Sequence, residues 1–170
     1  MNQSIIKVII PAYNEEDSIA KVIKDLPPFV DEIIVVNNNS TDATAKNAKE
    51  AGATVLTELK SGYGNACLKG IEYIKQQKKD TDIVVFLDGD YSDYPEELTK
   101  IVAPMIEKNI DFVIGSRVKK LREKGAMQPQ QIFGNWLATS LMALFFKSKF
   151  TDLGPFRAIK FDTLMRLQME

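Results

Sequence analysis

Short apolar runs rich in β-branched residues recur along the chain, and each has the length of a strand. They span residues 5–10, 32–36, 53–56, 83–87 and 112–114. Runs that are apolar at nearly every position, rather than at alternate positions, are typical of strands covered on both faces. The pattern therefore predicts a mainly parallel sheet.

Helical patterns fill the gaps between these runs. Apolar residues at helical spacing from Ile19 to Leu26 predict the first helix, with Asn14 as its N-cap and Pro27 as its stop. Ser40 is expected to cap the second helix, with Asp42 in its first turn and Gly52 at its end.

A third helix is expected from about Asn65 to Lys78, and a fourth opens at Pro95, with Pro104 predicted to bend or shorten it. The alternation of strands and helices predicts an α/β fold: a doubly wound, mainly parallel sheet with helices on both faces. Such sheets bind ligands beyond the carboxyl ends of their strands.

Composition removes several classes of function. The 22 basic and 23 acidic residues give a net charge of -1, so no global field attracts nucleic acid. The chain has no histidine, which excludes histidine triads and histidine-ligated zinc. The single Cys67 excludes an internal disulfide, and no signal peptide or membrane-spanning run is evident. A cytoplasmic protein is expected.

Two carboxylates, Asp88 and Asp90, flank Gly89 directly after the fourth apolar run. Magnesium and manganese prefer such oxygen ligands and keep coordination positions for substrate phosphates. The motif therefore predicts a divalent metal held by Asp88 and Asp90. A solvated acidic turn is the alternative interpretation.

Two other acidic motifs fit less well. An EF-hand loop starting at Asp88 would need glycine and glutamate where Asp93 and Thr99 stand. The haloacid dehalogenase phosphatases carry a similar Asp-x-Asp motif after their first strand, whereas here it follows the fourth.

Taken together, four segments resemble the family 2 glycosyltransferases of the GT-A fold, especially those that use polyprenyl-phosphate acceptors. The resemblance covers nearly the whole chain, and it rests on residues 8–16, 34–44, 62–66 and 86–90. It implies a nucleotide-sugar donor, expected to be a UDP-sugar, and a divalent cation. Implied donor-binding residues are Pro11, Ala12, Tyr13, Asn14, Glu15, Asp42, Asp88 and Gly89, with Asp90 on the metal.

The chain departs from the family after the second strand, where Asn37, Asn38 and Asn39 replace the usual acidic pair. An amide can still accept from a ring N–H and donate to a ring carbonyl of uracil, so these residues are expected to bind the base. Gly62 and Gly64 suit either a plain turn or close passage of a ribose or phosphate.

Candidate acceptor-side residues come later in the chain. Arg117 and Arg157 are expected to bind a diphosphate or an anionic acceptor, and residues 152–157 resemble the acceptor motif of polyprenyl-phosphate glycosyltransferases. Asp152 is the candidate general base for a hydroxyl acceptor, whereas a phosphate acceptor needs no base. The catalytic set is therefore Asp90, Asp152, Arg117 and Arg157.

Residues 119–131 are expected to form a loop that could act as a lid. Apolar and aromatic residues between 133 and 145 recur at helical spacing, which is typical of core and also fits a helix at a membrane surface. Peripheral contact with the inner membrane face is therefore a further expectation.

The sequence thus predicts one catalytic domain over residues 1–170, with a donor-binding half at 1–118 and an acceptor-side segment at 119–170. The resemblance also implies that family members continue further, so the chain is expected to be a fragment. The expected activity is metal-dependent, inverting transfer of a sugar from a nucleotide-sugar to a polyprenyl phosphate or glycan precursor. The alternatives are a non-catalytic nucleotide-sugar binding module and a phosphatase; the oligomeric state is left open.

Overall fold

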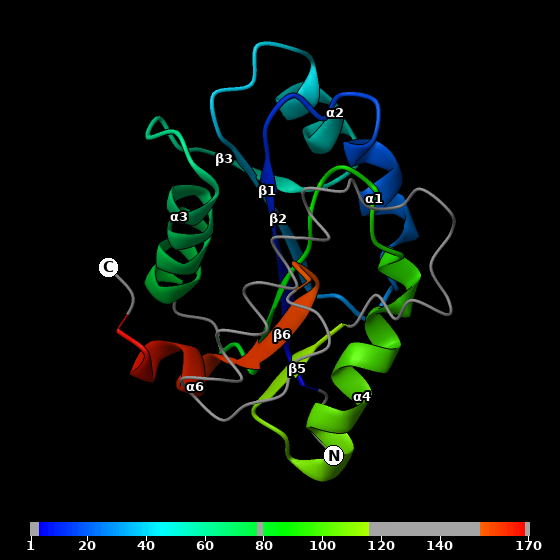
Figure 1. The fold of residues 1–170 in the computed structure, drawn as a ribbon, viewed down its shortest axis with the longest axis vertical. Helices are drawn as coiled ribbons and strands as arrows, with labels where there is room; N and C mark the ends of the chain where they lie inside the picture. Colours follow the sequence, from blue (N-terminus) through cyan, green and yellow to red (C-terminus); the bar gives the residue numbers. More distant parts are fainter. Residues whose placement is uncertain (1–3, 78–79, 116–153, 169–170) are drawn as a thin grey trace, which may run out of the picture. The chain divides into compact units, whose positions relative to one another are not determined.

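The computed structural model describes residues 4–77, 80–115 and 154–168 of the chain (Figure 1). Contacts between residues divide the chain into two units, one formed by residues 1–113 with 156–170 and the other by residues 114–155. The first unit contains the sheet core and the candidate site, and it joins residues 156–170 to the amino-terminal part of the chain.

A six-stranded sheet with the order β3-β2-β1-β4-β6-β5 forms the centre of the fold. The pairs β1–β2, β1–β4 and β2–β3 are parallel, and β6 is antiparallel to β4. The mainly parallel α/β fold predicted from the sequence is confirmed. The strands are β1 (Ile6–Ala12), β2 (Glu32–Asn37), β3 (Thr54–Thr57), β4 (Ile83–Phe86), β5 (Phe112–Ile114) and β6 (Arg157–Lys160).

Helices cover both faces of this sheet, as Figure 1 shows. Buried side chains of α1, α2 and α4 pack on one face, and those of α3 and α6 pack on the other. None of the helices in the described ranges is long and apolar enough to cross a bilayer. The helices are α1 (Ile19–Asp25), α2 (Thr44–Glu50), α3 (Tyr63–Gln76), the 3-10 turn η1 (Pro95–Glu97), α4 (Leu98–Lys108) and α6 (Phe161–Arg166).

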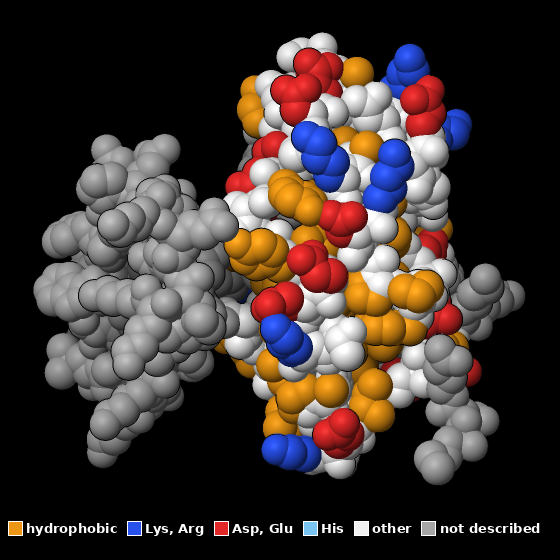
Figure 2. Space-filling model, turned by 90° about the vertical axis from the view of Figure 1, so that its right-hand side faces the viewer, with side chains coloured by type: hydrophobic (Ala, Val, Ile, Leu, Met, Phe, Trp, Pro, Cys, Tyr) orange, Lys and Arg blue, Asp and Glu red, His pale blue; other side chains and the backbone are white. Residues whose placement is uncertain are grey.

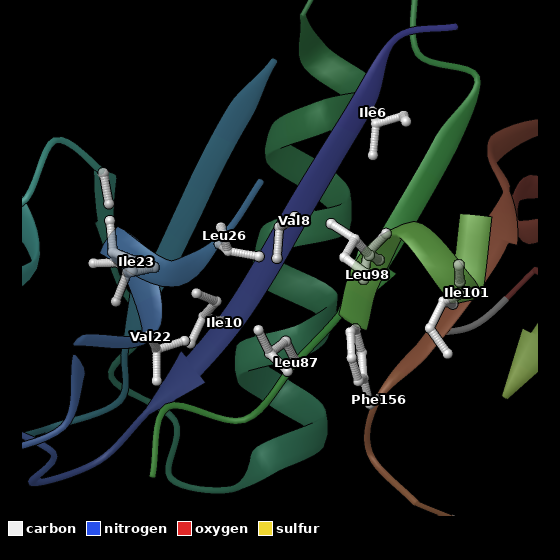
Figure 3. Close-up of a cluster of buried hydrophobic side chains, with 14 of the residues drawn as sticks. Ile6, Val8, Ile10, Val22, Ile23, Leu26, Leu87, Leu98, Ile101 and Phe156 are labelled. Atoms are coloured by element: carbon white, nitrogen blue, oxygen red, sulfur yellow. The ribbon is translucent and has the colours of Figure 1, made fainter. Parts of the chain in front are cut away.

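Side chains that alternate along β1 belong to two hydrophobic clusters, one on each face of the sheet. Ile6, Val8 and Ile10 belong to the cluster beneath α1 and α4, where Figure 3 shows them beside the side chains of those helices. Ile9 belongs to the cluster beneath α3. Because consecutive side chains of a strand point to opposite faces, a run that is apolar at every position suits a strand in the middle of three layers.

The first two helices begin differently from the sequence prediction. The N-cap position of α1 is Ser18, so the prediction that Asn14 is its N-cap is wrong. Asn14 adopts a left-handed conformation with φ of 56°, and its side chain instead accepts a hydrogen bond from the Thr41 amide. Ser40 is not a cap either, because α2 starts at Thr44 and the Ser40 hydroxyl accepts from the Asn14 amide.

Later elements differ in two further ways. Helix α4 runs through Pro104 to Lys108, so the proline does not shorten it. Strand β6 was not predicted, although the paired Arg157–Lys160 segment lies beside β4. Its sequence, Arg-Ala-Ile-Lys, is too short and too polar at its ends to stand out as an apolar run.

A buried ion pair joins the amino ends of β1 and β2. The Lys7 side chain is 2% exposed, and its Nζ lies 3.1 Å from Oε2 of Glu32. Tyr73 of α3 donates a hydrogen bond to Oε1 of the same carboxylate. Burial raises the pKa of Glu32, but the hydrogen bonds from Lys7, Tyr73 and Gln77 outweigh it and leave the pKa lowered. The Glu32 carboxylate therefore joins the carboxyl-terminal part of α3 to the sheet.

Helix α3 approaches β1 very closely at Gly70. A Cβ atom at this position would lie 2.7 Å from Cγ2 of Ile9, closer than carbon atoms pack. Ile9 is itself fully buried beneath the helix, so it has little room to shift. The glycine therefore sets the separation between α3 and the sheet.

We predict that Gly70→Ala lowers the free energy of unfolding by about 1 to 2 kcal/mol, because overpacking outweighs the better helix propensity of alanine. Gly64→Ala, in the first turn of the same helix, is the matched control because no atom lies within 4 Å of its added Cβ. Urea denaturation of both variants measures the difference. Equal stability of the two variants would show that α3 does not pack as tightly as described.

The surface over the right-hand side of Figure 1 mixes charges of both signs. Figure 2 shows acidic and basic side chains interspersed there, with several groups of apolar side chains between them. This face is consistent with the net charge of -1 and offers no extended basic surface. On this face, any attraction of a charged ligand must therefore come from a local group of residues.

Candidate active site

The loops that follow β1, β2, β3 and β4 meet at one edge of the sheet, because these strands are parallel and their carboxyl ends coincide. Hydrogen bonds join the loop after β1 to the loop after β2. The Glu15 amide donates to Oγ1 of Thr44 at 2.7 Å, and the Glu16 amide donates to Oδ2 of Asp42 at 3.2 Å. Asp42, expected to bind the donor, serves here as a link between the two loops.

Asn38 fastens the third loop to the second. Its Nδ2 donates to the carbonyl oxygens of Glu58 at 2.9 Å and Lys60 at 2.8 Å. Its Oδ1 accepts from the Gly62 amide at 2.8 Å. Gly62 has a φ of 125°, which a residue with a side chain rarely adopts. One buried amide thus determines the path of residues 58–62 and the start of α3.

The neighbouring asparagines also bind the protein itself. Oδ1 of Asn37 accepts from the Ser40 amide at 3.3 Å, and Nδ2 of Asn39 donates to the Leu59 carbonyl at 2.8 Å. A uracil ring would have to compete with three hydrogen bonds for the side chain of Asn38. Base recognition by this segment stays a prediction, and the described contacts assign it a structural role.

A pocket of about 220 Å³ opens between these loops. Most of its lining consists of residues that the sequence predicted for the donor site, whereas Tyr63 and Ala66 of α3 were missed. Asn14, Asn37, Asn39, Asp42, Gly62 and Gly64 do not line it. The lining residues are Pro11, Ala12, Tyr13, Glu15, Asn38, Tyr63, Ala66, Asp88, Gly89 and Asp90.

The acidic pair lies on the β4 side of the pocket. A Cβ atom on Gly89 would lie 3.3 Å from Cδ1 of Ile19, so the backbone between the two carboxylates is packed directly on the core. Asp90 is exposed, and its Oδ1 accepts from the Ser92 amide at 2.9 Å. The Asp88 side chain is half-buried. The loop therefore presents both carboxylates on a backbone that cannot easily move.

This donor set fits magnesium or manganese bound jointly with a phosphate. Within the described ranges, no group of three or more acidic, cysteine or histidine side chains could hold a metal alone. Magnesium sites commonly use one or two carboxylates and complete the shell with water and substrate phosphates. Asp88 and Asp90 match that arrangement.

Glu15 adds negative charge to the same pocket. Burial raises the pKa of Glu15, the hydrogen bond from Ser18 opposes this, and the charges of Asp90 and Asp42 raise it further. The pocket is therefore acidic and would repel a bare diphosphate.

Tyr63 connects the pocket to strand β6. Arg157, Cys67 and Asp88 lie close enough to its hydroxyl to influence its pKa. Burial raises the pKa of Tyr63 and raises that of Cys67 to about 11, and the nearby charge of Asp88 acts in the same direction on both. Both groups are therefore neutral at physiological pH.

Strand β6 brings Arg157 to this position. Arg157 pairs with Phe86 in the antiparallel register, two residues before Asp88. The arginine expected on the acceptor side thus lies near the acidic pair, although it does not line the pocket. Several other predictions fall outside the described residues: Arg117, Asp152, the lid at 119–131 and the amphipathic stretch at 133–145.

Comparison with known proteins identifies the family: the chain belongs to glycosyl transferase family 2, whose model matches residues 7–167. Protein RfbJ of Shigella flexneri is 38% identical over 114 residues, covering 66% of this chain and 84% of that protein. The UDP-N-acetylglucosamine–dolichyl-phosphate N-acetylglucosaminyltransferase of Methanococcus voltae is 30% identical over 154 residues, covering 79% of this chain and 61% of that enzyme.

Solved structures agree with the fold. Glucosyl-3-phosphoglycerate synthase of Mycobacterium tuberculosis, in complex with Mn²⁺, UDP-glucose and phosphoglyceric acid, superposes with a TM-score of 0.73 at 26% identity. The match covers 95% of this chain and 58% of that one. The chain thus spans little more than half of this enzyme, and 61% of the Methanococcus transferase.

We predict that Asn38→Asp lowers the free energy of unfolding by about 2 kcal/mol, because a carboxylate cannot donate to the carbonyls of Glu58 and Lys60. Hydrogen exchange should also become faster at the Gly62 amide. Asn37→Asp is the control, since it keeps the oxygen that accepts from Ser40, and its stability should stay within about 0.5 kcal/mol of wild type. Equal losses in the two variants would contradict the role assigned to Asn38.

Proposed function

We propose that this domain binds a UDP-sugar together with a divalent cation and transfers the sugar to an anionic acceptor. The observation that carries the proposal is the pocket at the carboxyl edge of the sheet, where Asp88 and Asp90 stand opposite the loop after β1. Membership of family 2 supports a transferase. The Mn²⁺ and UDP-glucose bound by the Mycobacterium enzyme support the choice of donor and cation.

The chain's own residues divide the work. Asp88 and Asp90 would hold the cation, which when bound would offset the charge that grows on the departing diphosphate. Gly89 keeps the backbone between them close to the core, so the two carboxylates need little rearrangement to bind. Pro11, Ala12 and Tyr13 would border the nucleoside on the other side of the pocket.

Arg157 is the described residue best suited to an anionic acceptor. A guanidinium can bind a phosphate through two parallel hydrogen bonds, and Arg157 lies next to the acidic pair. A phosphate acceptor is already a nucleophile and requires alignment rather than deprotonation. The dolichyl-phosphate substrate in the name of the Methanococcus relative supports a polyprenyl phosphate as that acceptor.

We predict that UDP binding requires Mn²⁺ or Mg²⁺, because the pocket carboxylates otherwise repel the diphosphate. Isothermal titration calorimetry should show UDP affinity falling at least about tenfold in excess chelator, and by a similar factor in Asp90→Asn with metal present. The control is Asp162→Asn, which removes the same charge from the first turn of α6. Undiminished affinity of Asp90→Asn would show that the acidic pair does not link metal and donor.

We predict that Arg157→Gln weakens use of a polyprenyl phosphate by about 1.5 to 3 kcal/mol while leaving UDP affinity nearly intact. Transfer from a UDP-sugar is measured in the full-length protein, with Arg166→Gln at the end of α6 as the matched control. Loss of donor binding in Arg157→Gln would refute the role assigned to Arg157, and transfer by the wild type to a neutral soluble sugar but not to a polyprenyl phosphate would refute the anionic acceptor. Donor binding without transfer in the wild type would indicate a non-catalytic binding module instead.

A further inference from the structure

The turn that follows the acidic pair contains a residue in a strained conformation, Tyr91. Its φ of 61° lies in the left-handed region, which a residue with a bulky side chain rarely adopts. Three of the other four described non-glycine residues with positive φ are asparagines, for which this conformation costs less. A strained backbone persists only where the surrounding structure holds it, and such residues gather at functional sites. Contacts around Tyr91 must therefore stabilise this conformation.

Helix α1 supplies contacts on both sides of Asp90. The Tyr91 hydroxyl donates a hydrogen bond to Oδ2 of Asp25, the last residue of α1. Gly89, which precedes Asp90, packs against Ile19, the first residue of the same helix. Helix α1 in turn packs on the sheet through the core cluster of Figure 3. The two neighbours of Asp90 are thus both attached to one helix that the core holds in place.

The turn also determines which oxygen of Asp90 is available to a ligand. Oδ1 accepts from the Ser92 amide at 2.9 Å and so closes a turn around Tyr91. Oδ2 has no hydrogen-bond partner among the described residues, and Asp90 lines the pocket. A carboxylate with one oxygen engaged by the backbone can still bind a divalent cation through the other. The position of that oxygen depends on the conformation of Tyr91, because Tyr91 is the middle residue of the turn.

We propose that Tyr91 is a positioning residue, which holds the Asp90 carboxylate in place for the divalent cation through its hydrogen bond to Asp25. The role rests on the function proposed above and adds two residues that the sequence analysis did not select. Tyr91 does not line the pocket, so it acts on a ligand there only through its neighbours in the turn. A turn that is already ordered loses less conformational freedom when the metal binds, and this strengthens binding.

Tyr91→Phe tests the proposal, because it removes the hydroxyl and keeps the ring. Tyr94→Phe is the matched control: Tyr94 is 53% exposed, and its hydroxyl has no hydrogen-bond partner in the described part of the chain. Asp25→Ala removes the acceptor, whereas Asp25→Asn keeps an oxygen that can accept from Tyr91. Tyr91→Phe and Asp25→Ala should therefore behave alike, and Asp25→Asn should behave like the wild type.

The first measurement is the affinity of UDP for the full-length protein, by calorimetry with Mn²⁺ and again in excess chelator. With Mn²⁺ we expect the affinity to fall about three- to tenfold in Tyr91→Phe and in Asp25→Ala, because the loosened turn must be ordered on binding. In chelator both variants should match the wild type within about twofold. The double variant should lose no more than either single variant, since both substitutions remove the same contact.

The second measurement is hydrogen exchange at the Ser92 amide, which reports on the turn without any ligand. We expect exchange to be several-fold faster than in the wild type in Tyr91→Phe and in Asp25→Ala. It should be unchanged in Tyr94→Phe and in Asp25→Asn. Faster exchange together with a loss of affinity only in Mn²⁺ separates positioning of Asp90 from a general distortion of the pocket.

Undiminished affinity of Tyr91→Phe for UDP with Mn²⁺ would overturn the proposal, while Mn²⁺-dependent binding by the wild type would leave the proposed function standing. An equal loss of affinity in chelator, or in Tyr94→Phe, would overturn it as well, because the effect would not pass through the metal. Failure of the wild type to bind UDP with Mn²⁺ would refute the proposed function and, with it, the metal-binding part of this role. The exchange rates at Ser92 would then still decide whether the contact with Asp25 holds the turn.

Discussion

The geometry of the candidate site depends on the side-chain amide of Asn38. Its three hydrogen bonds hold residues 58–62 against the end of β2, and this determines where α3 begins. The start of α3 places Tyr63 on the pocket wall, with Arg157 near enough to influence its pKa. At its other end the same helix is tied to β1 and β2 through Tyr73 and the Lys7–Glu32 ion pair. Polar contacts at both ends of α3 thus orient it, while the close approach at Gly70 sets its depth.

Much of the fold could be predicted from the sequence because the information is local. Strands β1 to β5 are short, apolar and separated by helical patterns, and their covering on both faces explains why they are apolar throughout. Strand β6 could not be predicted in this way, because its pairing with β4 depends on contacts between residues more than 70 positions apart. Asn14 was mistaken for a cap because its partner, Thr41, belongs to another loop.

The candidate site was predictable to a similar extent. Parallel strands bring their carboxyl ends together, so residues that follow β1 and β4 line the pocket as expected. The roles of individual side chains were harder to predict, because an asparagine that binds a ligand and one that binds a loop carbonyl look alike in sequence. Tyr63 was missed for the same reason: only the folded chain places its hydroxyl beside Arg157.

The position of β6 between β4 and β5 also has a consequence for how the protein folds during its synthesis on the ribosome. Strands β1 to β4 can pair with one another once residue 86 has been synthesised, because all of their parallel partners lie before that point. Strand β5 lies next to β6 in the sheet, so it can join the sheet only after residues 157–160 have been synthesised and have paired with β4. Domains generally form from the amino terminus onward during synthesis. The acidic pocket can therefore form early in synthesis, whereas Arg157 reaches its position only after β6 has been synthesised.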